Sequence, residues 1–81
     1  MYVQSSKTVT HQPQITVRCL RFEISLNCIY GYDENDKSHL LDMYADNQTA
    51  ERAYELIYDH LAAGDHAVKM LDIRKKLGLL R

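Results

Sequence analysis

Apolar and polar residues alternate along residues 15–33, and this is the strongest pattern in the chain. The apolar residues stand first on odd positions and then on even positions: Ile15, Val17 and Cys19, followed by Leu20, Phe22, Ile24, Leu26, Cys28, Tyr30 and Tyr32. A period of two predicts strands with one buried face. The run is too long for a single strand. We therefore expect two strands, broken near residue 20 or around 25–27, with Tyr30 and Tyr32 in the core.

Residues 33–37 are polar, and they separate this run from a second apolar stretch at 40–44, which predicts a hairpin turn. Asp33 and Asn35 have the spacing of a calcium loop. Lys37 and Tyr44 occupy positions where that loop needs oxygen ligands, so we exclude a calcium site. Valine and threonine residues before position 15 predict a short strand, or a flexible start, over 1–14.

Residues 47–63 have the period of an amphipathic helix. Asp46 or Asn47 can cap its first turn, and Gly64 can end it. The stripe expected to face the core is Ala50, Ala53, Tyr54, Ile57 and Leu61, and the opposite side carries Glu51, Arg52, Glu55 and Asp59. After the helix we expect a last extended segment over 67–73 and then a basic and apolar tail over 74–81.

These elements predict one α+β domain over residues 1–81. We expect a small, mostly antiparallel β-sheet of four to five strands, packed against one amphipathic α-helix at about residues 47–63. The apolar content of 46% and the charged content of 26% are those of an ordinary globular chain. No apolar run approaches the roughly 18 residues of a membrane span. The first residues have no secretory pattern, so we expect a cytoplasmic protein without membrane contact.

The net charge of −1 conceals three blocks of different sign. Residues 1–32 carry +2, residues 33–66 carry −7 and residues 67–81 carry +4. Such asymmetry bears on association rather than on the fold. We interpret the acidic block as a solvated helix face or as a docking face for a basic partner. The residues of that possible face are Glu51, Glu55 and Asp59.

No catalytic, phosphate-binding or metal-ligating pattern stands out in the sequence. The three glycines are isolated, no two histidines lie four apart on the helix, and His60 is interpreted as a surface residue. Cys19 and Cys28 lack the spacing of a zinc site and are interpreted as small apolar residues of a sheet. We therefore expect a non-catalytic protein with no cofactor and no metal.

The C-terminal tail is the strongest candidate for a contact with another molecule. It combines cations with leucines after the last regular element, and leucines left in water form the kind of patch that marks an interface. The candidate residues are Arg74, Lys75, Lys76, Leu77, Leu79 and Leu80. The tail could serve a homodimer or a protein partner, or it could fold back onto its own domain.

We accordingly expect a small interaction module that binds a protein partner or itself. The alternative is a nucleic-acid-binding accessory protein that uses Arg18, Arg21 and the basic tail. A sequence pI of about 6.4 makes nucleic acid the less favoured partner.

Several short motifs resemble a family of small uncharacterised proteins from low-GC Gram-positive bacteria and their phages or plasmids. These motifs are a Ser-x-Lys turn at 5–7, the run at 29–33, the pair Leu40-Leu41 with Tyr44 three residues on, and Glu51-Arg52-Ala53 at the start of the helix. The likeness spans about residues 2–73. Members often have glycine where this chain has Asp42, and often lack the tail. The resemblance implies the order strand, strand, strand, helix, strand and an accessory protein of a mobile element, but no activity.

Overall fold

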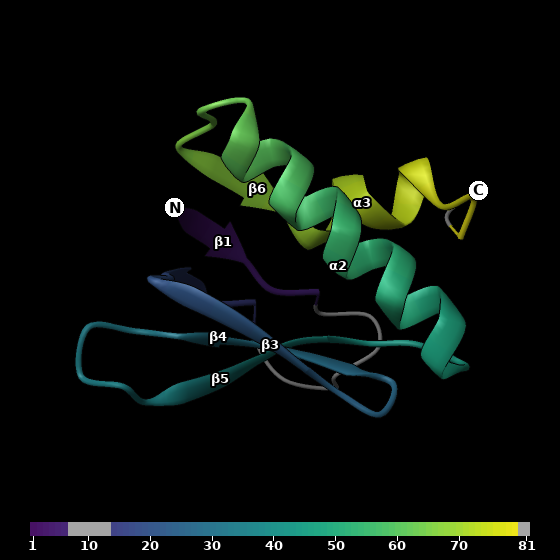
Figure 1. Ribbon diagram of the computed structural model, residues 1–81, viewed down its shortest axis with the longest axis horizontal. Coiled ribbons are helices and arrows are strands. Elements are labelled where there is room, and N and C mark those ends of the chain that lie inside the picture. The colour runs from purple at the N-terminus through teal and green to yellow at the C-terminus, as the bar shows by residue number, and fades with distance from the viewer. Residues whose placement is uncertain (7–13, 80–81) are drawn as a thin grey trace.

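The computed structural model describes residues 1–6 and 14–79, which form an α+β fold with two three-stranded sheets (Figure 1). The fold class predicted from the sequence is confirmed. The elements in chain order are β1 (Tyr2–Gln4), β2 (Thr16–Arg18), β3 (Arg21–Ser25), β4 (Cys28–Tyr32), β5 (Ser38–Met43), α2 (Asn47–Ala62), β6 (Ala67–Lys69) and α3 (Met70–Lys76).

The strands β3, β4 and β5 form an antiparallel sheet built from two successive hairpins. Both breaks considered for residues 15–33 occur, one between β2 and β3 and the other between β3 and β4. The turn between β3 and β4 has only two residues, since Ser25 pairs with Cys28. This turn moves the buried positions from even numbers in β3 to odd numbers in β4.

The two tyrosines of β4 consequently lie on the face away from the core. Tyr30 pairs with Glu23 and Tyr32 with Arg21, and cross-strand partners share one face of a sheet. Glu23 and Arg21 are both exposed. The expectation that Tyr30 and Tyr32 pack in the core is wrong, because the two-residue turn reverses the phase of the alternation.

The other sheet has the order β2-β1-β6 and joins the two ends of the chain. Its β1–β2 pair is antiparallel and its β1–β6 pair is parallel. Val3, Val17 and Val68 stand in register across it and are buried. The chain thus forms two small sheets instead of one sheet of four to five strands, because β2 pairs with β1 while β3 pairs with β4.

Residues 70–76 form a helix, not the extended segment expected over 67–73. Met70 and Ile73 are both fully buried, and a spacing of three places them on one face of α3. Only the residues of β6 are extended. Arg74, Lys75 and Lys76 are therefore helical residues and not part of a tail.

The long helix α2 matches the predicted helix closely. The Asp46 carboxylate caps it by accepting a hydrogen bond of 2.7 Å from the Thr49 N–H, and Gly64 follows its end with a φ of +80°. Its buried residues are Ala50, Ala53 and Ile57. Leu61, which was expected in the same stripe, is 37% exposed.

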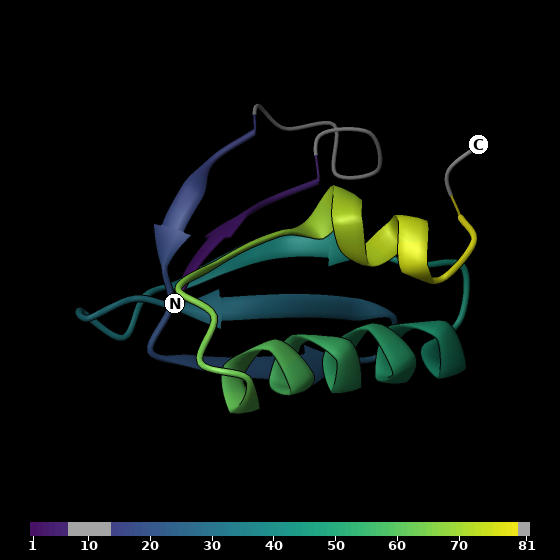
Figure 2. The same cartoon turned by 90° about the horizontal axis from the view of Figure 1, so that it is seen from above.

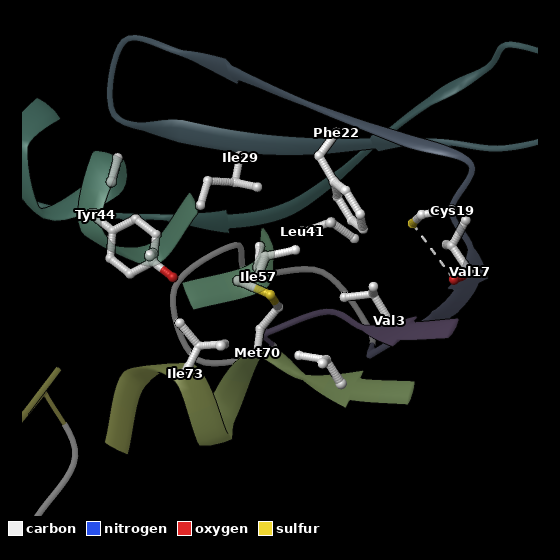
Figure 3. Close-up of a cluster of buried hydrophobic side chains, with 13 residues drawn as sticks. Val3, Val17, Cys19, Phe22, Ile29, Leu41, Tyr44, Ile57, Met70 and Ile73 are labelled. Atoms are coloured by element: carbon white, nitrogen blue, oxygen red, sulfur yellow. Dashed lines mark hydrogen bonds between the residues drawn. The ribbon is translucent and has the colours of Figure 1, made fainter. Parts of the chain in front are cut away.

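The two helices and the β2-β1-β6 sheet cover one face of the β3-β4-β5 sheet (Figures 1 and 2). Their inward side chains form one apolar cluster (Figure 3). Its members are Val3, Val17, Cys19, Phe22, Ile29, Leu41, Tyr44, Ala50, Ala53, Ile57, Val68, Met70 and Ile73. Seen from above, β6 and α3 run beside α2, which places the two helices next to each other on the surface (Figure 2).

Gly31 on β4 gives a first prediction, because it leaves room for the thiol of Cys19. A Cβ atom at position 31 would fall on the Cys19 Sγ and lie 3.1 Å from the Leu41 Cδ1. We expect Gly31→Ala to lower the free energy of unfolding by about 1–3 kcal/mol, measured by urea denaturation. The same substitution should cost less in a Cys19→Ala background, where the sulfur is gone. Equal costs in the two backgrounds would contradict this account.

Candidate functional site: the groove between the two helices

A groove runs along the surface between α2 on one side and the β6–α3 segment on the other. Its largest hollow, about 370 Å³, lies against β6. The residues that line this hollow are His60, Asp65, Ala67, Val68, Lys69 and Asp72. Two smaller hollows, of about 240 and 190 Å³, continue it toward the C-terminal end of α3.

The hollows share residues and therefore form one continuous depression. The first and second both contact His60 and Asp65, and the second and third both contact Leu56, Asp59 and Lys76. The groove is lined by charged side chains and by apolar ones, the latter including Leu56, Ala63, Ala67 and Val68.

A hydrogen-bonded chain crosses the middle of the groove through His60. The His60 Nδ1 lies 2.6 Å from the Asp65 Oδ2, and its Nε2 lies 3.0 Å from the Lys76 Nζ. A lysine ammonium can only donate, so the Nε2 must accept and the Nδ1–H must donate to Asp65. This chain requires a neutral imidazole and ties α2 to α3.

The sequence did not reveal this role for His60. Asp65 reaches the imidazole because the chain reverses at Gly64, where the Asp65 N–H donates to the His60 carbonyl. Lys76 comes from a helix that the sequence pattern did not indicate. No spacing rule joins these three residues, and only the packing of α3 beside α2 brings them together.

The acidic face and the basic segment predicted from the sequence meet at this groove. Glu55 and Asp59 line its third hollow, together with Lys76 and Leu77. Glu51 lies one turn earlier on the exposed side of α2. Part of each candidate set thus lines one depression, although the two sets are far apart in the sequence.

Leu77, besides lining the third hollow, packs against the core. The remaining residues of the predicted basic segment lie elsewhere. Lys75 is exposed, and Leu79 is 41% exposed. Leu80 lies outside the described residues. Arg74 faces inward, with only 13% of its side chain exposed.

Arg74 forms an ion pair with Asp42 beneath α3. The Arg74 Nη1 donates to the Asp42 Oδ1 at 3.0 Å, and the guanidinium also lies over the Tyr44 ring. Asp42 is fully buried because the ladder between β4 and β5 shifts at Leu41, which turns Leu41 and Asp42 both inward. Simple alternation would have left one of them in solvent.

Burial dominates the electrostatics of this cluster. It raises the pKa of Asp42, although the Met43 N–H and the Arg74 charge favour the ionised carboxylate. Burial and the neighbouring Asp42 charge also raise the pKa of Tyr44. The Tyr44 hydroxyl interacts with the Asp42 carboxylate and favours its ionised form, whereas the Arg74 Nε is buried without a hydrogen-bond partner in the part of the chain that the structure describes.

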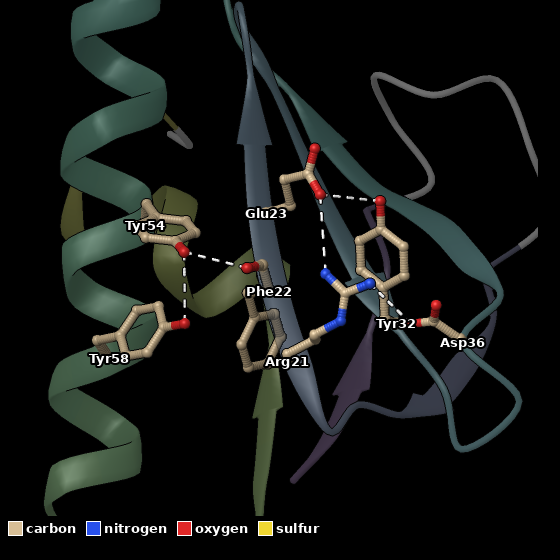
Figure 4. Close-up of polar contacts among 7 residues, drawn as sticks. All are labelled: Arg21, Phe22, Glu23, Tyr32, Asp36, Tyr54 and Tyr58. Carbon is tan, nitrogen blue, oxygen red and sulfur yellow. Dashed lines mark hydrogen bonds and ion pairs between the residues drawn. The ribbon is translucent and has the colours of Figure 1, made fainter.

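The cations of the alternative nucleic-acid surface are also separated. Arg21 pairs with Asp36 at 2.7 Å and Glu23 at 3.8 Å, and its guanidinium lies 3.7 Å from the Tyr32 ring centroid (Figure 4). Arg18 is exposed on β2, with no ion pair among the described residues. Arg21 and Arg74 are thus both engaged by carboxylates of the same chain.

Comparisons of the chain with protein-family models, curated proteins and solved structures found no match. Over residues 1–6 and 14–79, no three His, Cys, Asp or Glu side chains are grouped to hold a metal ion. The same residues contain no helix that is long and apolar enough to cross a bilayer.

The Asp42–Arg74 pair gives a second prediction. Asp42→Ala and Arg74→Met should each lower the free energy of unfolding by about 3–5 kcal/mol, because each leaves the other charge without its partner. The double variant should lose less than the sum of the two, since no uncompensated charge remains. Urea denaturation of the four proteins measures this coupling, and strictly additive losses would contradict it.

The raised pKa of Asp42 also gives a pH dependence. Since the folded-state pKa lies above the unfolded value near 3.8, folding favours the protonated carboxyl. Its stabilising contribution is complete below that value and is lost as the pH rises through the folded-state pKa. The stability of the wild type relative to Asp42→Asn should accordingly fall with rising pH across this window.

Proposed function

We propose that this protein is a small, non-catalytic interaction module that binds a basic protein partner through the outer face of α2 and the adjoining groove. The face consists of Glu51, Glu55 and Asp59, and we call it the acidic face. A cytoplasmic accessory role in a mobile element, as the sequence resemblance implies, is compatible with such a module and belongs to the same proposal.

One observation carries the proposal: the acidic face is left over when the other acidic residues are paired. Residues 33–66 contain nine acidic side chains. Five of them make hydrogen bonds or ion pairs within the chain: Asp33, Asp36, Asp42, Asp46 and Asp65. Among the described residues, the four without such a partner are Glu34 and the three residues of the acidic face.

The spacing of the acidic face is unfavourable for the isolated helix. Glu51, Glu55 and Asp59 follow one another at intervals of four, so each like-charged pair destabilises the helix by about 0.2–0.5 kcal/mol. Arg52 stands on the same exposed side, three residues before Glu55, and offsets part of this repulsion. A basic partner would relieve the remaining repulsion on binding, which gives the arrangement a function that a purely solvated face lacks.

Self-association is a second candidate, favoured by the apolar residue Leu79 beyond α3, which is 41% exposed. Leu77 does not add to this surface because it packs against the core. Nucleic acid has less support, because Arg21 and Arg74 are occupied by carboxylates.

The third prediction tests the acidic face. Reversing Glu51, Glu55 and Asp59 to lysine should weaken binding to a basic partner captured from the cells that encode the protein by about tenfold or more. The melting temperature should stay nearly unchanged, because all three side chains are exposed. Affinity should also fall as salt is added. Titration calorimetry with the purified partner measures the affinity and its dependence on salt, and thermal denaturation measures the melting temperature.

The matched control for the third prediction is Glu34→Lys. Glu34 is an exposed acidic residue of the β4–β5 turn, likewise without a partner among the described residues and distant in sequence from α2. The variant Glu34→Lys changes the charge of the protein by the same amount as Glu55→Lys. Equal affinity of the triple variant and the wild type, or equal losses from these two single variants, would contradict a role for the acidic face.

The fourth prediction concerns self-association. If Leu79 contributes to a dimer, Leu79→Ser should shift the protein from dimer to monomer in light scattering and leave the circular dichroism spectrum unchanged. Leu61→Ser on α2 is the control, since Leu61 has a similar exposed fraction of 37%. A wild-type protein that is monomeric at high micromolar concentration would contradict self-association.

A further inference from the structure

We propose that the free edge of β6 receives an extended, basic peptide segment of the partner, which adds a fourth strand to the β2-β1-β6 sheet inside the groove. This inference rests on the proposed function and names how the partner docks. It follows from the main-chain groups of β6, the hollow beside them and the carboxylates around that hollow.

The hydrogen bonding of β6 is complete on one side only. The Tyr2 N–H donates to the His66 carbonyl, and the parallel register places Tyr2 opposite Ala67. In a parallel ladder alternate residues bond to the neighbour, so Val68 faces β1. The N–H and C=O of Ala67 and the N–H of Lys69 therefore face away from the sheet. None of the described residues bonds to these three groups.

The space beside this edge is open. The hollow of about 370 Å³ contacts all three residues of β6 and also His60, Asp65 and Asp72. An added strand lies about 4.8 Å from its neighbour, and main-chain hydrogen bonds then supply affinity independent of sequence. The groups that such a strand needs are thus present and unoccupied among residues 1–6 and 14–79.

Two of the other sheet edges are already blocked. The Tyr54 hydroxyl donates to the Phe22 carbonyl at 3.1 Å on the edge of β3 (Figure 4). The Ser6 N–H donates to the Leu41 carbonyl at 2.9 Å on the edge of β5. Native proteins cover exposed edges in this way. The edges of β2 and β6 remain free, and of these two only the edge of β6 borders the hollow of about 370 Å³.

The hollow has a small excess of negative charge, which favours a peptide with lysine or arginine side chains over an acidic one. Asp65 and Asp72 line it together with Lys69. Farther along the groove, Glu55 and Asp59 stand beside Arg52 and Lys76. Asp72 has no ion-pair partner among the described residues. A second copy of this chain fits less well, because a whole domain would have to bring its own edge between β6 and the end of α2.

The decisive variant is Ala67→Pro, with Thr16→Pro as its matched control. Proline removes the Ala67 N–H, which faces the open side, and so spares the pairing of β6 with β1. Thr16 lies on the other free edge of the same sheet. Its N–H also faces outward, because Val17 pairs with Val3 and Ser5 N–H donates to the Ile15 carbonyl. Both variants place proline on an edge, but only one of them lies in the groove.

The probes are three fluorescent decapeptides: one of alternating valine and lysine, one of alternating valine and glutamate, and the basic peptide with alternate amides N-methylated. We expect the basic peptide to bind wild type and Thr16→Pro, and to bind Ala67→Pro about tenfold more weakly or worse. The acidic and N-methylated peptides should not bind. In wild type, the basic peptide should slow amide exchange at Ala67 and Lys69, a readout that does not depend on the proline variants folding.

Several results would overturn the proposal. They are equal affinity of the basic peptide for wild type and a folded Ala67→Pro, no slowing of exchange at Ala67 and Lys69, or no binding of the basic peptide at all. Exchange at these amides that slows with protein concentration alone would instead assign the edge to a second copy. If the acidic-face variant loses the captured partner while Ala67→Pro retains it, the strand addition is wrong and the proposed function stands.

Discussion

The ion pair between Asp42 and Arg74 is the constraint on which the position of α3 depends. It joins the β3-β4-β5 sheet to a helix of only seven residues, which is too short to be stable by itself. Met70 and Ile73 supply the apolar contact of this helix, but apolar contacts are not directional. The charged hydrogen bond fixes how far α3 lies along the sheet, and therefore where Lys76 stands relative to His60.

The shape of the groove depends on this buried ion pair. One wall of the groove is α2, an amphipathic helix that packs on the core through Ala50, Ala53 and Ile57. The other wall is β6 followed by α3, which is held at one end by β1 and at the other by Asp42. A buried charge pair is a costly way to stabilise a protein. In this fold it specifies a surface, because it orients the helix that carries the exposed cations.

The sequence predicted the parts of the fold that depend on local pattern. The period of α2, its cap at Asp46 and the alternation in β3 and β4 could be recognised because each is repeated over many residues. The change of the buried positions from even to odd numbers in β4 could not be predicted from the sequence. It depends on a two-residue turn in which Leu26 adopts a φ of +55°, a conformation that leucine rarely takes. Helix α3 was missed since two buried residues, Met70 and Ile73, fit a strand or a helix equally well before their neighbours are known.

The candidate site was predicted only in pieces. Charge counting indicated the acidic face, and the cations with leucines indicated the C-terminal segment. Sequence reasoning could not show that Asp59 and Lys76 line the same depression, because that depends on the pairing of β6 with β1. The burial of Asp42 could not be predicted either. It depends on the shift of the β4–β5 register at Leu41, and no sequence pattern in this stretch indicates such a shift.

The parallel pairing of β1 with β6 also governs the order in which the molecule can be completed. Its partners, such as Val3 and Val68, are separated by almost the whole described chain, so closing them carries a large loop entropy. The hairpins of the β3-β4-β5 sheet need only local contacts. The β1–β2 pair does not depend on β6, and within it Val3 already stands opposite Val17. The groove, by contrast, depends on the distant contact, because the pairing of β6 with β1 positions one of its walls.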